Sequence, residues 1–216
     1  MALEKTDSYD EKASEPEIRT ALARFLIASI HDESPVLASE AVYGFENRRA
    51  DFIYADDYSH AYEIKSDFDT TFRLQAQISE YTKTFDYVSV LTTPRLIADV
   101  RKEIPRRVGL LMFRNGQISL VRKAAQIRSL SKIHLAASIS KTGLSQALPA
   151  ASKSYSVDEI RRRAASELTL QQLRVAFLEE LKYRFSDTTR IFLNEIDQSV
   201  EGEDLLLLRR GSRLSF

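Results

Sequence analysis

The most regular pattern near the start of the chain is a series of apolar residues that recur every three or four positions between Glu15 and His31. This spacing predicts an amphipathic helix, in which Pro16 is tolerated because it falls in the first turn. Three short β-rich runs follow at 41–45, 51–55 and 61–65, with turn-forming residues between them. Runs of this length and separation predict a meander of three strands.

Helical and strand patterns then alternate along the chain. The sequence predicts helices over 71–84 and from Pro94 to Glu103, and the apolar, β-branched run at 87–91 is typical of a buried strand. Two further strands, at 108–113 and 118–121, are joined through Asn115 and Gly116, a pair that favours a tight hairpin. This mixture predicts an α/β core over residues 15–122, with a mixed central sheet flanked by helices.

The pattern weakens after the predicted core. Residues 123–155 are rich in Ala, Ser, Lys and Arg and contain the breakers Gly143 and Pro149, so we expect a basic linker there. Helical spacing returns over 156–196, where Ser156 and Glu159 fit a capping box. We therefore divide the chain into a polar segment (1–14), the core (15–122), the basic linker (123–155) and a small helical C-terminal unit (156–216).

The composition excludes several classes of protein. The sequence has no cysteine, so it forms neither disulfides nor thiolate metal sites, and no apolar run approaches the roughly 18 residues of a membrane-spanning helix. The polar amino terminus does not resemble a secretory signal. Isolated histidines and the lack of a glycine-rich phosphate loop argue against a zinc site, a Ser-His-Asp triad and nucleotide hydrolysis. We expect a cytoplasmic protein without a membrane partner.

Charge is distributed unevenly, although the net charge of the chain is zero. Residues 1–100 hold 10 Lys and Arg against 19 Asp and Glu, a net charge of −9, whereas residues 101–163 hold 14 against 3, a net charge of +11. Residues 164–216 have a net charge of −2. An acidic half beside a basic belt indicates a carboxylate-rich site next to a phosphate-attracting surface, although a solvated basic linker would give the same counts.

Three charged residues on two neighbouring predicted strands indicate a site. Alternate side chains of a strand share a face, so Glu63 and Lys65 point to the same side of the strand at 61–65. Asp51 begins the preceding strand, and a turn near 56–59 would bring it beside Glu63. Two carboxylates would then meet one ammonium group among apolar neighbours.

We expect a ligand to bind between two carboxylates that lie this close. Like charges at close range repel, and without a ligand one carboxylate would tend to bind a proton. A divalent cation removes this conflict, and hard oxygen ligands in a chain without cysteine favour Mg²⁺ or Mn²⁺. Such an ion can activate water and stabilise charge on a phosphoryl group, while the lysine orients the nucleophile or offsets developing charge.

An Asp followed by Glu-x-Lys on the next strand resembles the signature of the PD-(D/E)XK nuclease superfamily. The resemblance spans residues 15–115 in the order helix, three strands, helix, strand, and is closest to bacterial members with an Arg-Ala-Asp strand and a Tyr-Glu-Ile-Lys-Ser-Asp strand. Ala50 stands where the family name has proline, which lowers the specificity of the match without touching the chemistry. The resemblance implies a restriction-endonuclease-like core.

Gln77 and Tyr81 extend this match. They are four residues apart on the predicted helix 71–84 and share a face, so they resemble the Gln-x-x-x-Tyr element of RecB-like nucleases. The resemblance implies that both lie beside the metal and the nucleic-acid strand. It also implies an acidic residue from the first helix or first strand, for which Glu17 and Glu40 are the candidates, with Glu17 preferred.

The sequence therefore predicts a Mg²⁺-dependent nuclease. Asp51, Glu63 and the backbone carbonyl of Ile64 are the expected metal ligands, and Lys65 is expected to assist attack of water on a phosphodiester. The resemblance favours DNA over RNA as the substrate. Two other interpretations stay open: a non-catalytic module that binds nucleic acid through the basic belt, and an assembly role in which the C-terminal helices form a homodimer or dock into a larger complex.

Overall fold

The computed structural model describes residues 12–30, 34–45, 48–148, 155–196, 200–209 and 211. Most of the polar segment expected at 1–14 lies outside the described residues. The same holds for 149–154 of the expected linker and for parts of the expected C-terminal unit, 197–199, 210 and 212–216.

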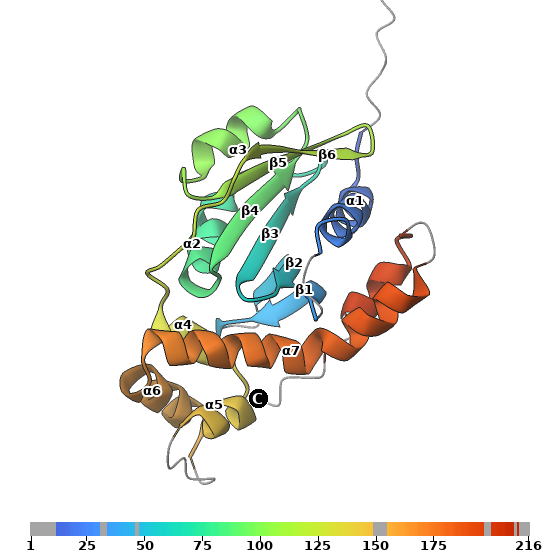
Figure 1. Ribbon diagram of the computed structural model, residues 1–216. Coiled ribbons are helices and arrows are strands. Elements are labelled where there is room, and N and C mark those ends of the chain that lie inside the picture. The colour runs from blue at the N-terminus through green and yellow to red at the C-terminus, as the bar shows by residue number, and fades with distance from the viewer. Residues whose placement is uncertain are drawn as a thin grey trace, which may run out of the picture.

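The centre of the molecule is a six-stranded mixed sheet with its strands in sequence order (Figure 1). The strands are β1 (Val36–Tyr43), β2 (Arg48–Ala55), β3 (Ser59–Lys65), β4 (Tyr87–Thr92), β5 (Gly109–Arg114) and β6 (Gln117–Arg122). β1 to β3 form an antiparallel meander, β4 and β5 run parallel to β3, and β6 returns antiparallel to β5. The predicted α/β class with a mixed sheet is confirmed.

Helices flank both faces of this sheet (Figure 1). They are α1 (Glu15–Ile27), α2 (Leu74–Thr84), α3 (Ile97–Glu103), α4 (Lys132–Ala137), α5 (Lys141–Ala147), α6 (Val157–Glu167), α7 (Leu170–Glu195) and the 3-10 helix η2 (Asp204–Arg209). α1 and η2 share a buried cluster with Tyr62 and Ile64. α2 to α6 and most of α7 contribute to a second buried cluster, with Ile53 and Ala61. The two clusters use alternate residues of β3, as expected for its two faces.

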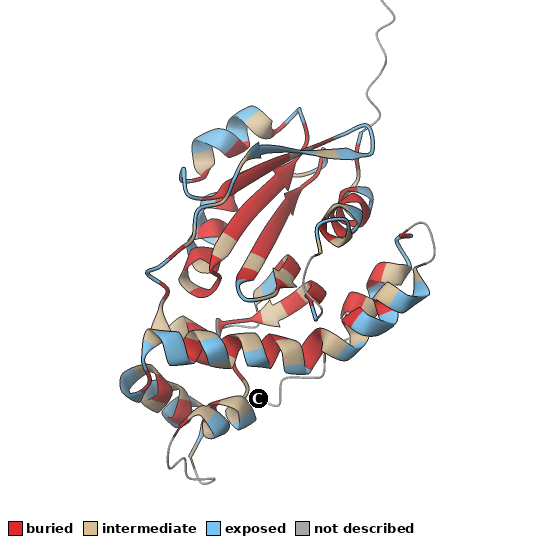
Figure 2. Ribbon diagram, in the orientation of Figure 1, coloured by how far each residue is buried: buried red, intermediate tan, exposed pale blue. Residues whose placement is uncertain are grey.

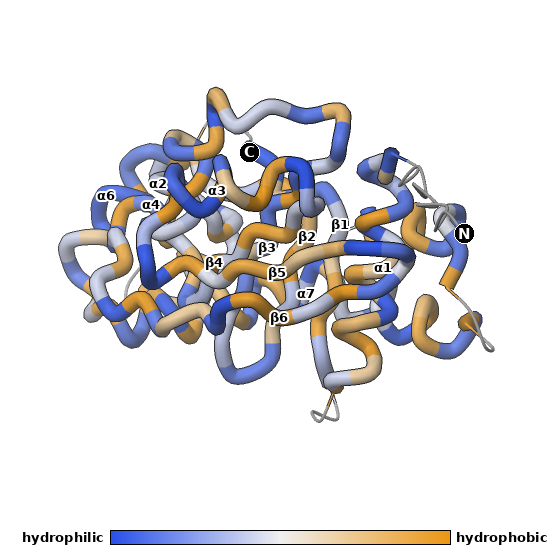
Figure 3. The backbone as a smooth tube through the Cα atoms, turned by 90° about the horizontal axis from the view of Figure 1, so that it is seen from above, coloured by the Kyte–Doolittle hydropathy of each residue, from blue (hydrophilic) through white to orange (hydrophobic). Residues whose placement is uncertain are grey.

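The central strands are the most deeply buried part of the sheet. β3 and β4 are buried along most of their length (Figure 2), and hydrophobic residues concentrate along the strands at the centre of the view from above (Figure 3). β6 lies at the sheet edge and is mostly exposed. Polar side chains on β3 are therefore drawn into the interior, and Glu63 and Lys65 are only 1% and 8% exposed.

The opposite edge of the sheet is covered by α7. The Thr189 hydroxyl accepts a hydrogen bond from the Leu37 N–H and donates one to the Leu37 carbonyl, both at 3.0 Å. Arg184 donates to the Val42 carbonyl at 2.9 Å. These contacts satisfy backbone groups of β1 that an open edge strand would expose. Among the described residues, no helix combines the length and apolar character needed to cross a membrane.

The C-terminal half differs from the expectation in two ways. The segment expected to be a basic linker contains α4 and α5, whose Leu135 and Leu144 are buried in the same cluster as the sheet. The region 156–196, where continuous helical spacing was expected, is interrupted between α6 and α7. The division follows from a further capping box at the start of α7, in which the Thr169 hydroxyl caps the helix and Gln172 Oε1 accepts a hydrogen bond from the Thr169 backbone N–H at 2.8 Å.

Candidate active site

Asp51 lies where β2 and β3 separate. The β2–β3 ladder ends at the pair Phe52–Tyr62, one residue short of Asp51. Beyond the ladder, Asp51 Oδ2 accepts a hydrogen bond from the Ile64 backbone N–H at 2.8 Å. Because the N–H and C=O of one residue in a strand leave on the same edge, the Ile64 carbonyl also faces β2. The structure thus brings together two of the predicted metal ligands, the Asp51 carboxylate and the Ile64 carbonyl.

The carboxylate of Glu63 is held at both of its oxygens. Lys65 Nζ donates to Oε1 at 2.7 Å, and the Tyr81 hydroxyl donates to Oε2 at 2.8 Å. Tyr81 reaches the strand from α2 and also donates to the Arg49 carbonyl at 3.3 Å. Residues from β2, β3 and α2 therefore form one cluster, which we call the acidic cluster: Asp51, Glu63, Lys65 and Tyr81. Asp51 is half-buried, and the other three side chains are buried.

The acidic cluster carries an electrostatic conflict. Burial raises the pKa of the Asp51 carboxyl above its ordinary value, and the charge of Glu63 raises it further. The hydrogen bond from Ile64 and the charge of Lys65 act in the opposite direction. Burial, together with the charges of Glu63 and Asp51, also holds the pKa of Tyr81 well above its ordinary value, so its hydroxyl stays a donor. The cluster contains more potential negative charge than its one lysine neutralises.

Gln77 lies one helical turn before Tyr81 and is half-buried. In the described part of the chain, its side-chain oxygen is buried without a hydrogen-bond partner. Buried polar atoms are seldom left in this state in folded proteins. Gln77 therefore retains hydrogen-bonding capacity next to the turn that carries Tyr81, but the described contacts connect only Tyr81 to Glu63.

Glu17 is not brought to the acidic cluster. It is exposed and completes the capping box of α1, where its Oε2 accepts from the Ser14 N–H at 3.4 Å. The acidic side chain of α1 whose charge raises the pKa of Asp51 is Glu15. The sequence contained a signal against Glu17, because the spacing Ser14-x-x-Glu17 fits a capping box and assigns Glu17 to the cap.

Glu40, the other acidic candidate, lies across from Asp51 in the β1–β2 register but at an irregular point of β1, with a backbone φ of 50°. Its carboxylate pairs with Arg19 at 2.9 Å and with Arg209 at 2.8 Å. Arg19 also pairs with Glu15. Glu40 therefore belongs to an ion-pair network that joins β1, α1 and η2 beside the acidic cluster.

The donors of the acidic cluster suit a divalent cation that keeps part of its water. In the residues that the structure describes, no group of three or more His, Cys, Asp and Glu side chains is placed to hold a metal. Mg²⁺ is commonly bound by one or two carboxylates together with waters and substrate phosphates. Asp51, Glu63 and the Ile64 carbonyl match that set, and a cation there would relieve the repulsion that raises the Asp51 pKa.

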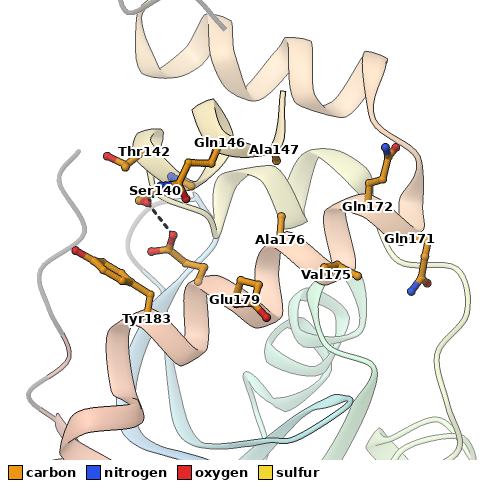
Figure 4. A pocket seen from close by; sticks show the side chains of 12 residues that line it. Ser140, Thr142, Gln146, Ala147, Gln171, Gln172, Val175, Ala176, Glu179 and Tyr183 are labelled. Carbon is orange, nitrogen blue, oxygen red and sulfur yellow. Dashed lines mark hydrogen bonds between the residues drawn. The ribbon is translucent and has the colours of Figure 1, made fainter. Parts of the chain in front are cut away.

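A separate hollow of about 670 Å³ lies between α5 and α7 (Figure 4). At this hollow Ser140 Oγ donates to Glu180 Oε2 at 2.7 Å, and Val175 and Tyr183 contribute exposed apolar surface. Its lining contains no residue of the acidic cluster. The geometry that bears on metal chemistry therefore lies in the sheet, at the point where β2 and β3 separate.

The sequence matches the family described as bacteriophage P4 protein cII over residues 8–209. The chain belongs to this family. Protein cII of Enterobacteria phage P4 is 27% identical over 213 residues, which cover 94% of this chain and 80% of that protein. The match to the cII family includes every described element from α1 to η2.

A solved structure of a protein of unknown function from Silicibacter pomeroyi is 24% identical in sequence. The matched region covers 52% of this chain and 74% of the Silicibacter pomeroyi chain, with a TM-score of 0.41. A TM-score this low does not establish a shared fold.

Proposed function

We propose that this member of the cII family is a metal-dependent nuclease that hydrolyses phosphodiester bonds, with DNA as the substrate. The observation that carries the proposal is the acidic cluster, in which Lys65 and Tyr81 hold opposite oxygens of Glu63 while Asp51 lies close enough for their charges to interact. A carboxyl group whose pKa is raised by burial and by a neighbouring carboxylate, as that of Asp51 is, is typical of functional sites.

The order of the elements supports a restriction-endonuclease-like core. α1 precedes the antiparallel meander of β1 to β3, α2 follows, and β4 then pairs in parallel with β3. This is the order of helix, three strands, helix and strand that the PD-(D/E)XK resemblance implies. In this arrangement Asp51 and Glu63 come from neighbouring strands and Tyr81 comes from the helix that follows, as the motif requires.

Each residue of the acidic cluster has a different role in the proposed reaction. Asp51, Glu63 and the Ile64 carbonyl would hold Mg²⁺ or Mn²⁺, and the chemistry such an ion supplies when bound is activation of water and neutralisation of charge on the phosphate. Lys65 would orient the attacking water and offset charge that develops on the phosphodiester. The Tyr81 hydroxyl fixes the second oxygen of Glu63, which keeps that carboxylate in one orientation.

The test is a cleavage assay on supercoiled plasmid, linear duplex and single-stranded DNA, with Mg²⁺, Mn²⁺ or EDTA. We expect metal-dependent cutting by the wild type and a loss of about 100-fold or more in Lys65→Ala, because one preorganised group at a developing charge commonly contributes that much. Asp51→Ala should lose both cleavage and metal binding. Lys65→Ala should lose cleavage and retain metal binding, measured by titration calorimetry.

The matched control is Lys182→Ala, which removes a lysine of α7 that is paired only loosely with Glu179, at 3.8 Å. It should cut like the wild type. Circular dichroism must show that all variants are folded. Full activity in Lys65→Ala, or no cutting by the wild type on any substrate with either metal, would contradict the proposal. The second result would favour the non-catalytic nucleic-acid-binding module.

A further inference from the structure

A second charged site lies at the β6 edge of the sheet, where α3, the turn after it and the end of β6 meet. It is a pocket of about 500 Å³ lined by three arginines and three apolar residues: Arg101, Ile104, Arg106, Leu110, Val121 and Arg122. We call it the arginine pocket. Arg101 and Arg106 come from α3 and the turn after it, whereas Arg122 comes from the end of β6, so the fold brings the third arginine to the other two.

The guanidinium group of Arg122 is fixed in place. Its Nε donates to the Val108 carbonyl at 2.9 Å, and one terminal nitrogen donates to the Pro105 carbonyl at 3.3 Å. These bonds leave further N–H donors of the planar fork unused. An arginine that is already ordered loses little side-chain entropy when it binds, which is the condition for a preorganised anion site.

The positive charge of the pocket is not neutralised. In the described part of the chain, no ion pair joins Arg101, Arg106 or Arg122 to a carboxylate, whereas Arg163, Arg174 and Arg190 are each paired. Burial lowers the pKa of Arg122, and the charges of Arg101 and Arg106 lower it further, so the three groups repel one another. Residues 101–128 contain eight Lys and Arg and a single acidic residue, Glu103.

We propose that the arginine pocket binds a phosphate group, and that this phosphate belongs to the backbone of the nucleic acid. The second part rests on the proposed function. Three guanidinium groups around an open pocket offer planar N–H donors and positive charge to the anionic oxygens of a phosphodiester, and the apolar walls formed by Ile104, Leu110 and Val121 reduce competition from water. The pocket shares no lining residue with the acidic cluster. The phosphate that it binds is therefore a different one from the phosphate that is cleaved.

The first experiment measures DNA binding in EDTA, where no cleavage occurs, by fluorescence anisotropy of labelled duplex and single-stranded DNA over a range of salt. The variant is Arg101→Gln with Arg106→Gln, which leaves the anchored Arg122 and its backbone contacts intact. We expect binding at low salt to weaken about 10-fold or more, and the slope of log affinity against log salt to become shallower by up to about 1, because the pocket holds one phosphate.

The matched control is Arg162→Gln with Arg190→Gln, which removes the same charge from α6 and α7. It should change the affinity less than about 3-fold, because α6 and α7 lie on the other side of the molecule from α3 and β6 (Figure 1) and their charges act only through screened, long-range attraction. An equal loss in both double variants would overturn the proposal, since binding would then follow net charge and not the pocket.

The second experiment separates the possible sources of the phosphate. Inorganic phosphate should raise the Tm of the wild type above its value in chloride at equal ionic strength, and the pocket variant should lose this shift. A shift with no effect of the variant on DNA binding would support a free-phosphate site and overturn the backbone assignment. No shift and no effect on DNA would overturn both parts. If the wild type binds DNA through the pocket but cuts no substrate, the proposed nuclease activity is contradicted and phosphate binding by the pocket still holds.

Discussion

Two buried carboxylate sites share one sheet, and they are built differently. Asp86 lies just before β4, accepts hydrogen bonds from the Ser59 N–H and hydroxyl at 3.0 Å each, and pairs with Arg174 at 2.6 Å. The acidic cluster places Asp51 and Glu63 near each other, and among the described residues the cation that is hydrogen-bonded to Glu63 is Lys65. The first site joins β3, β4 and α7 through hydrogen bonds from Ser59 to Asp86 Oδ2 and through an ion pair between Arg174 and Oδ1, which has no hydrogen-bond partner among the described residues. The second site keeps two carboxylates close together.

This difference indicates that one site stabilises the fold and that the other is arranged to bind a ligand. A carboxylate that only stabilises the fold gains most when each of its oxygens has a partner, because an unpaired buried charge is very unfavourable. Two carboxylates kept close together lower stability unless something else binds between them. The Asp86 site is therefore expected to contribute to stability alone, and the acidic cluster to reduce stability until its ligand is present.

The largest expected effect is at the structural site. Asp86→Ala removes the partner of Arg174 and of Ser59, so we expect the free energy of unfolding to fall by about 3–5 kcal/mol. Urea denaturation measures this loss. The control is Asp158→Ala, an exposed residue that is paired with Arg161 at 3.8 Å, and it should change stability by less than about 1 kcal/mol. A loss that small in Asp86→Ala would mean that the Asp86 site does not hold the elements together.

His60 shows another way to bury a titratable group, which is to stay neutral. Its ring nitrogens contact Ser89 at 2.9 Å and Tyr62 at 3.1 Å, and burial lowers its pKa to about 3. The unfolded chain, with an ordinary histidine, takes up a proton below about pH 6.5, so the stabilising contribution present above that pH is lost as the pH falls.

We therefore expect the wild type to lose roughly 1 kcal/mol per pH unit between about pH 6.5 and pH 4.5. His60→Gln, which cannot take up a proton, should flatten this slope while keeping a side chain able to bond Ser89 and Tyr62. Urea denaturation at several pH values measures both slopes. Equal slopes would show that the pKa of His60 does not differ between the folded and the unfolded protein in this pH range.

The sequence locates the strands and the first helices because their patterns are local. Alternation along 61–65 places Glu63 and Lys65 on one face, and the structure joins them by a hydrogen bond. The Asn115–Gly116 turn was recognisable because both residues adopt positive φ, 51° and 75°, which few other residues tolerate. Capping explains the helix starts at Ser14 and Ser156 in the same local terms.

The sequence does not locate features that depend on packing between distant segments. α4 and α5 are short helices, stabilised by burial of Leu135 and Leu144 in the core and not by their own spacing. β1 begins at Val36, earlier than the strand expected at 41–45, because the irregular Glu40 interrupts its alternation. The distribution of charge along the sequence predicts a basic belt, but only the fold shows which arginines converge.

The smallest expected effect bears most directly on the central claim, that the acidic cluster reduces stability until a metal is bound. The measurement is the free energy of unfolding of the wild type and of Asp51→Asn, each in EDTA and in Mg²⁺. Asn removes the charge and can still accept the hydrogen bond from Ile64, so the variant should be about 1 kcal/mol more stable than the wild type in EDTA.

Mg²⁺ should then stabilise the wild type, by about 2–3 kcal/mol when the ion is near 100 times its Kd, and should leave Asp51→Asn unchanged. The order of stability of the two proteins would thus reverse between the two conditions. If Asp51→Asn is less stable than the wild type in EDTA and Mg²⁺ shifts both proteins equally or neither, the acidic cluster is a structural ion pair and the account is wrong.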